Sequence, residues 1–410
     1  MEVLIERCCG LDVHQAEVVA AVLIQTEKKR PEKVIRRFRT VRDELEQMRA
    51  WLLELGVTHV GMESTGVYWM PVYMVLEDRL TLIVGNATHI RNVPGRKTDV
   101  NDAEWIAHLV RHGLIRPSMV PDPMMRELRE YTRYRRKLVE AQATERNRVL
   151  RLLETAGIKL ASFASDVFGV SGRRMLAALA AGAPDPADIA ELAKGTLRRK
   201  RVDLTRALRG DFQAHHRFLL QIHLRRIQQI ETDIALLDQR IDAALLPVKD
   251  DFERLQEIPG IDRICAAVII AELGVDMSHF PSAGHAAAWA GVCPGNNESA
   301  GKRKTQHARR GNVPLKTALT QAAVGASKAK GTYYRDKYWR LRARRGAPRA
   351  AMAIAHKLLI AAYHVLASAK PYKELGALYL DTLNKAGLVN RMRHRLEALG
   401  FQVTLTPNAA

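Results

Sequence analysis

Acidic residues stand where apolar runs end in the first third of this chain. Asp12 closes the run VLIERCCGLDVH, and Glu63 closes VTHVGME. Asp99 and Asp102 lie one helical turn apart in KTDVNDAEWIAHLV. Carboxylates at strand ends and on a helix can converge although they are far apart in sequence. The pattern therefore favours an α/β fold that gathers the four acids.

The order of elements in residues 1–112 predicts an RNase H-like domain. Three strand-like runs come first, and helices and strands then alternate up to DAEWIAHLVRHG. The expected strands and helices are VLIERCCGLDVH, AEVVAAVLIQ, KVIRRFRTV, ELEQMRAWLLELG, VTHVGME, YWMPVYMVLED, LTLIVGN and DAEWIAHLVRHG. In such a fold the first strand twists past the fourth, and the last helix crosses their ends.

Residues 122–249 read as mainly helical, with two long helices separated by a basic, turn-rich segment. In the first helix a heptad seam is interrupted by Arg135, Gln142 and Glu145; in the second it is broken only by His223. The seam residues are Leu128, Tyr131, Leu138, Val149 and Leu152, then Leu220, Ile227, Ile230, Ile234, Leu237, Ile241 and Ala244. This spacing predicts an antiparallel coiled coil within the chain or a coiled coil between chains.

The remaining sequence predicts a compact helical domain over residues 250–374 and a helical tail over 375–410 with a frayed end. LQEIPGIDRICAAVIIAELG has helical stretches on both sides of Pro259-Gly260, which resembles a helix-hairpin-helix that presents backbone N–H groups to phosphate. Asp262 stands where a second glycine is expected. The predicted division of the chain is 1–121, 122–249, 250–374 and 375–410.

The net charge is +20, which is typical of a protein that binds polyanions. Its distribution is uneven: the net charge is −2 over residues 1–110, +10 over 111–249 and +12 over 250–410. The four acids therefore lie in the nearly neutral third, and the basic surface belongs to the rest of the chain.

Composition argues against several other classes of protein. The cysteines, Cys8, Cys9, Cys265 and Cys293, form no C-x-x-C pair, so we expect neither a zinc site nor a disulfide framework. The N-terminus carries Glu6 and Arg7 within its apolar stretch, unlike a signal peptide. No apolar run reads as long enough to span a bilayer. We expect a cytoplasmic protein with no membrane partner.

Clustered carboxylates are the oxygen ligands that phosphodiester chemistry on Mg²⁺ requires, and Mn²⁺ fits the same ligands. Each acid also has a plainer interpretation, because Asp12 could be a turn residue, Glu63 a loop acid and Asp99 a helix cap. Glu104 shares the helix with Asp102 but faces elsewhere. His14 and His89 could be accessory groups or ordinary solvated or structural residues. The combination of acids, in this order, favours a metal site.

Ser299 lies in PGNNESAGKRK, where glycines let a backbone approach and a basic run can hold a phosphate. A lone serine in a polar loop is usually just solvated. A hydroxyl is a poor nucleophile without a base or metal, and no base stands nearby in sequence. Activation would have to come from the metal site, across a domain or subunit boundary.

The chain resembles the DEDD-class insertion-sequence transposases of the IS110 family, which are bridge-RNA-guided recombinases. GLDVH, GMESTGVYW and KTDVNDAEWIAHL resemble the motifs of their N-terminal RuvC-like domain. LQEIPGIDRICAAVIIAELG, FPSAGHAAAWAGVCPGNNESAGKRK and HARRGNVPLKTALTQAA resemble their C-terminal transposase domain. The PGNNESAGK form points to the IS1111 branch.

The resemblance implies that Asp12, Glu63, Asp99 and Asp102 bind Mg²⁺ and that Ser299 attacks DNA to form a phosphoserine. It implies donor and target DNA, a structured bridge RNA, and a dimer or tetramer with composite sites. Ala300 replaces a glycine and Glu298 a serine of many relatives, and Ser299 is the hydroxyl residue of this loop.

Basic residues supply candidate nucleic-acid contacts, because phosphate binding depends on them. These are Arg133, Arg136, Lys137, Arg199, Lys200, Lys302, Arg303, Lys304, Arg309 and Arg310. Tyr333, Tyr334, Tyr338 and Trp339 precede Arg340, Arg342, Arg344 and Arg345, and aromatics beside arginine can stack on bases. The alternative is that the aromatics are core and the arginines a solvated face.

Three functions remain open on these observations. The first is an RNA-guided DNA transposase that cuts and rejoins strands through phosphoserine. The second is a RuvC-like nuclease or junction resolvase in which water attacks and Ser299 is incidental. The third is a non-enzymatic DNA- or RNA-organising protein with a decayed site, which ranks last because all the acids are present.

Overall fold

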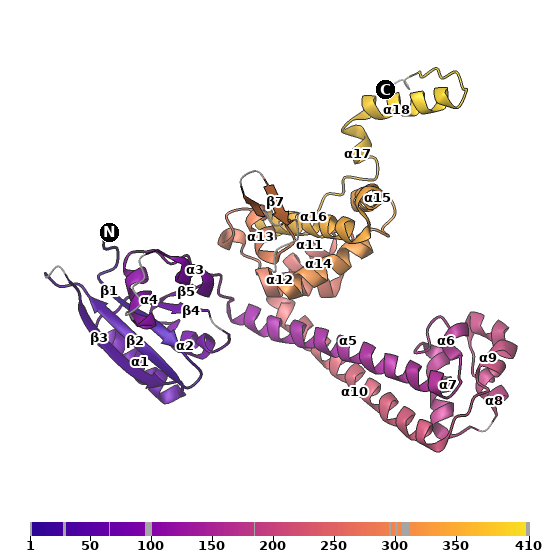
Figure 1. Ribbon diagram of the computed structural model, residues 1–410, viewed down its shortest axis with the longest axis horizontal. Helices are drawn as coiled ribbons and strands as arrows, with labels where there is room; N and C mark the ends of the chain where they lie inside the picture. Colours follow the sequence, from indigo (N-terminus) through magenta and orange to yellow (C-terminus); the bar gives the residue numbers. More distant parts are fainter. Residues whose placement is uncertain are drawn as a thin grey trace. The chain divides into compact units, whose positions relative to one another are not determined.

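A computed structural model describes residues 2–27, 30–64, 66–94, 101–183, 185–294, 297–299, 302–305 and 311–406, the backbone alone at 297–299 and 302–305. The chain divides into two compact units, Met1–Val120 and Pro121–Ala410, which we describe separately (Figure 1). The boundaries predicted from the sequence at 249/250 and 374/375 remain predictions.

The first unit is a mixed sheet with helices on both faces. Strands β1 and β2 and strands β2 and β3 pair antiparallel, whereas β4 runs parallel to β1 and β5 parallel to β4, giving the order β3-β2-β1-β4-β5. The elements are β1 (Arg7–Val13), β2 (Glu17–Ile24), β3 (Glu32–Arg39), α1 (Arg42–Glu54), β4 (His59–Glu63), α2 (Trp69–Leu76), β5 (Thr81–Gly85), α3 (Ala87–Asn92) and α4 (Asp102–Arg111). The sequence runs predicted each of these elements except α3.

Alternation along the strands divides the core of this unit between two faces. Cys9 and Leu11 of β1 pack in one cluster with Leu45 and Met48 of α1. Cys8 packs in another cluster with residues of α4 such as Ala107. Because successive side chains of a strand point to opposite faces, residues 8, 10 and 12 of β1 share the face that α4 covers.

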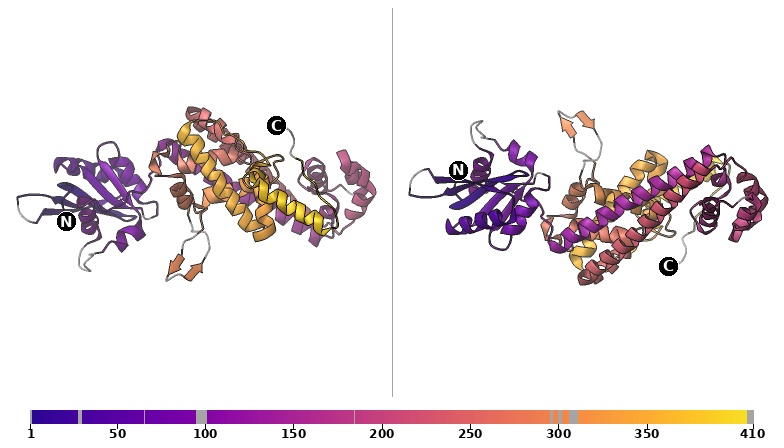
Figure 2. Two further views of the ribbon diagram at one scale, coloured as in Figure 1. Left: turned by 90° about the horizontal axis from the view of Figure 1, so that it is seen from above. Right: turned by 90° about the horizontal axis from the view of Figure 1, so that it is seen from below.

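The second unit begins with a long antiparallel pair of helices, α5 (Pro123–Thr155) and α10 (Ala214–Leu245), which lie side by side in Figures 1 and 2. Asp122 starts α5 by accepting a hydrogen bond from the Met125 N–H at 2.7 Å, and Pro123 fits the first turn, where an N–H is not needed. Because both helices belong to this chain, the pairing matches the first of the two predicted arrangements, a helix pair within the chain. Coiled-coil geometry in this pair remains a prediction.

Polar residues that interrupt the predicted seam find partners across the helix pair. Arg135 donates to Asp238 at 2.8 and 3.2 Å, and Gln142 donates to Glu231 at 2.8 Å. Glu145, which is 3% exposed, contacts His223 at 2.9 Å. Partner numbers fall along α10 as they rise along α5, so these pairs fix the antiparallel register.

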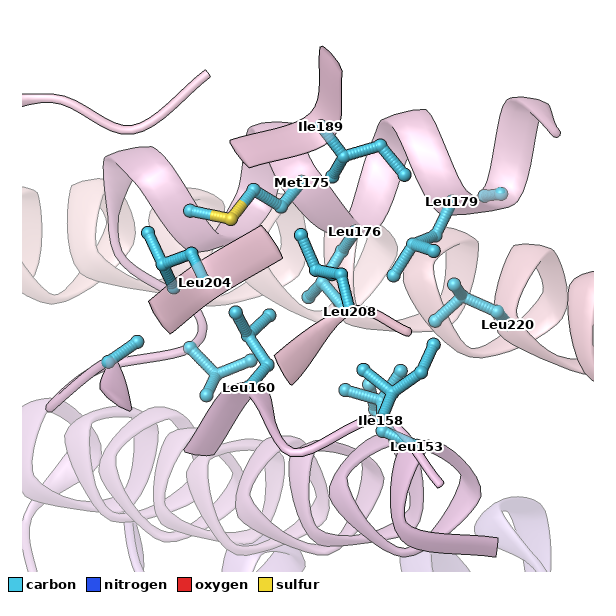
Figure 3. Close-up of a cluster of buried hydrophobic side chains, with 14 of the residues drawn as sticks. Leu153, Ile158, Leu160, Met175, Leu176, Leu179, Ile189, Leu204, Leu208 and Leu220 are labelled. Carbon is cyan, nitrogen blue, oxygen red and sulfur yellow. The ribbon is translucent and has the colours of Figure 1, made fainter. Parts of the chain in front are cut away.

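Between the two long helices the chain folds into a small cluster of short helices with a leucine-rich core. They are α6 (Leu160–Phe163), α7 (Val170–Ala181), α8 (Pro186–Glu191), the 3₁₀ turn η1 (Gly195–Lys200) and α9 (Arg201–Ala207). Figure 3 shows Leu160, Met175 and Leu204 meeting Leu220 of α10 and Leu153 of α5 in one buried cluster. This apolar core seats the short helices on one end of the helix pair.

In the described residues after α10, the second unit contains helices and one β-ribbon. Its elements are η2 (Leu246–Val248), α11 (Lys249–Gln256), α12 (Arg263–Leu273), η3 (Met277–His279), α13 (Ala283–Ala290), β6 (Asn297–Ser299), β7 (Lys302–Thr305), α14 (Val313–Ala326), α15 (Tyr333–Arg345), α16 (Ala347–Ser368), α17 (Tyr379–Thr382) and α18 (Lys385–Ala398). Helix α12 is buried along its whole length except near its start. The mixed α/β first unit and the mainly helical remainder confirm the predicted fold class at this level.

Helix α16 corrects one expectation drawn from composition. It is long and apolar enough to cross a membrane by those two measures, although the sequence was expected to hold no such run. Buried residues such as Ile354, Leu358 and Ala362 line it, and half of its most apolar window is buried in the protein. A core helix satisfies the same measures.

The turn at Pro259-Gly260 joins α11 to α12. Gly260 has φ +94°, and a Cβ there would stand 2.4 Å from the Ala322 carbonyl oxygen of α14, so the turn packs closely against that helix. The Asp262 carboxylate accepts the Cys265 N–H at 2.8 Å. This hydrogen bond caps the start of α12, and the resemblance of the turn to a helix-hairpin-helix remains a prediction.

Candidate functional site

The carboxyl ends of β1 and β4 place Asp12 and Glu63 next to each other in the first unit. The parallel register pairs Gly10 with Gly61 and Leu11 with Met62, so Asp12 and Glu63 follow as the next neighbours. Side-chain alternation puts both acids on the face that α4 covers. Two acids that are widely separated in sequence thereby lie at the carboxyl ends of adjacent strands.

Two glycines let α4 lie directly on this face. A Cβ on Gly10 would stand 2.1 Å from the Ala103 carbonyl oxygen, and a Cβ on Gly61 would stand 2.3 Å from the Val110 side chain. Asp12 pairs with Val19 of β2, and Val19 packs against Ala103 in the first turn of α4. The start of α4 is therefore held beside the strand end that carries Asp12.

Asp102 is the first residue of α4, and Asn101 caps the helix by accepting the Ala103 N–H at 3.2 Å. A small pocket brings Asp102 and Glu63 together. Its lining consists of Glu63, Ile90, Arg91, Asp102, Trp105 and Ile106. Two of the four predicted acids thus share one pocket, at a helix N-terminus.

The other two predicted acids stand differently. Asp12 lies outside the residues that line the pocket, and its Oδ2 is 3.1 Å from His14 Nε2. Asp99 lies outside the described residues. No three His, Cys, Asp or Glu side chains within the described part of the chain stand close enough together to hold a metal ion. Because Asp99 lies outside the described residues, the four-carboxylate cluster remains a prediction.

Neighbouring ionisable groups have structural roles. Glu104 binds Lys33 of β3 at 2.9 Å, away from the pocket lining. Burial lowers the pKa of His108 below 6.5, against the pull of the Glu104 carboxylate. Burial also raises the pKa of the Cys8 thiol to about 12, so this thiol stays protonated. Neither Glu104, which is held by Lys33, nor the protonated Cys8 thiol belongs to the pocket lining.

Arg91 and Trp105 were not anticipated from the sequence. Trp105 lies three residues after Asp102, so helical spacing alone could have placed it on the same face. Its Nε1 donates to the Ile90 carbonyl oxygen at 3.4 Å, which ties α4 to α3. Arg91 belongs to α3, the helix that the sequence runs did not predict.

Ser299 ends strand β6 and pairs with Lys302 at the start of β7, so the predicted serine loop is a β-ribbon (Figure 2). Lys302, Arg303 and Lys304 occupy β7. Arg309 and Arg310 lie outside the described residues.

The structure assigns internal partners to several of the predicted nucleic-acid contacts. Arg133 donates to both oxygens of the fully buried Glu272, at 2.8 Å each. Arg136 and Lys137 both bind Glu140, at 3.0 and 3.1 Å, on the exposed surface of α5. Lys200 Nζ donates to the Phe163 carbonyl oxygen at 3.3 Å. Arg133 therefore has a buried carboxylate as its partner although its own side chain is 48% exposed, and its contact with nucleic acid remains a prediction.

Aromatic residues of α15 divide between core and surface. Tyr333, Tyr334 and Tyr338 are at most 9% exposed, as the core interpretation expected. Trp339 is 48% exposed, and the Arg342 guanidinium carbon stands 4.6 Å from its ring centroid. Among the four aromatic residues of α15, Trp339 is the exposed one, and its pairing with Arg342 is compatible with contact to a base.

Two family models match the chain. Residues 9–158 match the model DEDD_Tnp_IS110, described as a transposase, and residues 252–340 match a model described as Transposase IS116/IS110/IS902 family. Together they cover more than half of the sequence, including the strand ends, the start of α4 and the β-ribbon. A search of curated proteins returns no match. The chain belongs to the IS110 family of transposases, enzymes that cut and rejoin DNA.

Proposed function

We propose that this transposase uses Asp12, Glu63, Asp99 and Asp102 to hold Mg²⁺ and uses Ser299 as the nucleophile that cuts DNA. The observation that carries the proposal is the shared pocket of Glu63 and Asp102, with Asp12 on the neighbouring strand end of the same face. The strand order β3-β2-β1-β4-β5 supports an RNase H-like domain. Mn²⁺ fits the same carboxylate ligands.

The residues present fit a divalent cation because carboxylate oxygens are the hard ligands that Mg²⁺ prefers. When bound, Mg²⁺ would stabilise charge on the phosphodiester oxygens. The neighbouring Arg91 lines the same pocket and can neutralise a DNA phosphate that enters it.

The proposed chemistry is a transesterification. The Ser299 oxygen attacks phosphorus, the new O–P bond replaces one P–O bond of the DNA, and the freed deoxyribose oxygen takes up a proton. The hydroxyl proton passes to a base in the carboxylate-rich pocket. Reversal of these steps on a second DNA end rejoins the strands and releases the serine.

Guidance by a structured bridge RNA and a dimeric or tetrameric assembly with composite sites are parts of the same proposal. The +20 net charge, concentrated outside the first 110 residues, is compatible with an RNA partner as well as with DNA. Sequencing of RNA that copurifies with the protein tests this part. One abundant structured RNA encoded beside the reading frame is the expected result.

A trapped protein–DNA adduct tests the serine. Denaturing gels of wild type and Ser299→Ala with labelled donor DNA should show a covalent adduct in the wild type and none in the variant, with DNA binding retained. Cleavage without any adduct, unchanged in Ser299→Ala, would instead support a RuvC-like nuclease or junction resolvase in which water attacks.

A further inference from the structure

Glu272 of α12 is a fully buried carboxylate that joins three separate segments of the second unit. Arg133 of α5 donates to both of its oxygens at 2.8 Å, and Arg129 Nε stands 3.3 Å from Oε2. Asn312 Nδ2 donates to Oε2 at 2.7 Å. The Glu272 side chain thus connects α12 to α5 and to the residue that precedes α14.

Asn312 ends the segment that carries the β-ribbon. Its Oδ1 accepts the Leu315 N–H at 3.0 Å and caps α14, and its own N–H donates to the Trp289 carbonyl oxygen at 3.2 Å. The adjacent Gly311, at φ +51°, lies so close to Gly291 that a Cβ would stand 2.4 Å from the Gly291 Cα. The chain just before the ribbon segment, at Gly291, and the chain just after it, at Gly311 and Asn312, are therefore in contact. We call these two places the root of the ribbon.

Arg129 strengthens the connection to α5. Its guanidinium donates to the Ala271 carbonyl oxygen at 2.8 Å and to the Glu272 carbonyl oxygen at 2.7 Å. Burial lowers the pKa of Arg129, and the Glu272 carboxylate opposes that effect. The α5–α12 contact is thus fixed by backbone as well as side-chain acceptors.

A buried carboxylate is a costly way to hold helices together, because well-packed apolar residues often stabilise as well or better. What the carboxylate adds is direction, since two arginines and one amide must each point at a defined oxygen. These directed contacts hold Asn312 in a defined place against α5 and α12.

We infer that Glu272 is a positioning residue for the serine-bearing ribbon: through Asn312 it fixes the root of that ribbon on α5. The inference rests on the proposed role of Ser299, because positioning matters only if the ribbon delivers the nucleophile. The consequence for catalysis is that loosening this link lowers the rate of strand attack and leaves the affinity for DNA intact.

Asn312→Ser isolates the link. Serine can still cap α14 but cannot donate to Glu272 from the same place. Amide exchange in peptides covering 297–305 should become about tenfold faster or more, with α12 and α14 still protected. The rate of adduct formation at saturating DNA should fall about tenfold or more, with the dissociation constant for DNA within about twofold of wild type.

The matched control is Asn384→Ser. Asn384 caps α18 in the same way, by accepting the Gly387 N–H at 3.1 Å, and among its described contacts there is no buried carboxylate. This variant should leave both the exchange of the ribbon and the adduct rate at wild-type values. An equal loss in Asn384→Ser would overturn the inference.

A further test swaps the carboxylate and the amide between positions 272 and 312. Glu272→Gln and Asn312→Asp should each lower the adduct rate, the second by setting two carboxylates against each other. The double variant replaces the opposed carboxylates of Asn312→Asp by an amide donor and a carboxylate acceptor, so its adduct rate should exceed that of Asn312→Asp. It should stay below the wild-type rate, because the amide at position 272 also faces the Arg133 and Arg129 donors. A merely structural role predicts that the adduct rate follows the melting temperature across all four proteins.

Wild-type ribbon exchange and a wild-type adduct rate in Asn312→Ser would refute the positioning role, even if Glu272→Gln fails to fold. The proposed function fails separately, if Ser299→Ala forms as much adduct as wild type. Amide exchange is measured without DNA cleavage. It therefore shows whether Asn312 holds the ribbon in place, whichever residue attacks DNA.

Discussion

Gly10 of β1 lies so close to Ala103 of α4 that a Cβ on the glycine would stand 2.1 Å from the Ala103 carbonyl oxygen. Ala103 directly follows Asp102, and Gly10 comes two residues before Asp12 on the same face of β1. The contact of strand and helix backbone therefore sets how near the two acids can come.

Gly10→Ala should push α4 away from the sheet. The nearest atoms to the new methyl group belong to the α4 backbone, which cannot turn aside as a side chain can. We expect the free energy of unfolding of the first unit to fall by about 3 kcal/mol or more, at the upper end of overpacking costs. Chemical denaturation followed by tryptophan fluorescence measures this change.

Gly61→Ala is the matched comparison in the same sheet. Its nearest neighbour is the Val110 Cγ2 atom, which can move, so the loss should be smaller than that for Gly10→Ala. Gly284→Ala in α13 meets only Ser282 Oγ at 3.5 Å and should cost nothing. Equal losses for Gly10 and Gly61 would contradict a backbone contact as the cause.

Much of the first unit could be predicted because its strands are short apolar runs closed by polar residues. The acids at the ends of β1 and β4 were visible in this way. The approach of α4 was not, because it depends on Gly10 and Gly61 lacking side chains at a contact between elements far apart in sequence. Helix α3 was missed, and with it Arg91.

The second unit shows a different limit of the sequence. Arg135, Gln142 and Glu145 read as interruptions of an apolar seam, because their partners Asp238, Glu231 and His223 lie about 80 to 100 residues away. Arg133 is exposed, but its ion pair with Glu272 could not be predicted, because Glu272 lies 139 residues away in the sequence. Ser299 read as a loop residue because GNNESAGK lacks apolar alternation.

Acidification should weaken the attachment of the short-helix cluster to the helix pair. Arg173 of α7 donates to the Glu231 carboxylate of α10 at 2.8 Å. This hydrogen bond lowers the pKa of Glu231 below 4.5, against the effect of burial, and the charges of Arg173 and Arg146 add to the lowering. A carboxylate with a depressed folded pKa stabilises the protein above its unfolded pKa and loses that contribution as the pH falls through the folded value. The melting temperature should therefore drop as the pH falls below about 4.5.

Glu231→Gln should flatten this part of the pH profile. Below the folded pKa the variant and the wild type should converge, because the wild-type acid is then neutral as well. Glu253→Gln serves as a control, since Glu253 is an exposed acid whose Lys249 partner stands 3.6 Å away. A wild-type profile in Glu231→Gln would rule out the Arg173 pair as a source of acid sensitivity.

Trp339 and Arg342 should contribute to nucleic-acid binding through stacking. Trp339→Ala should weaken binding of single-stranded DNA or RNA by about 1–3 kcal/mol. Arg342→Gln should lower the slope of log affinity against log salt concentration by about 1, if the guanidinium contacts one phosphate. Fluorescence anisotropy over a range of salt concentrations measures both effects.

Tyr338→Phe is the control for that surface. Tyr338 is 6% exposed and belongs to the core of α15, so removing its hydroxyl should leave the affinity at the wild-type value. If Trp339→Ala binds as tightly as wild type at every salt concentration, the exposed indole has no role in holding nucleic acid.

Manganese binding tests the central claim, that the acids at the ends of β1 and β4 and at the start of α4 hold a divalent cation. Titration of the full-length protein with Mn²⁺, read by the electron paramagnetic resonance of the free ion, should show sites whose affinity falls about tenfold or more in Glu63→Gln and Asp102→Asn. Glu104→Gln, which alters an acid held by Lys33, should bind Mn²⁺ like wild type. Equal binding by wild type, Glu63→Gln and Asp102→Asn would contradict the metal site and the mechanism built on it.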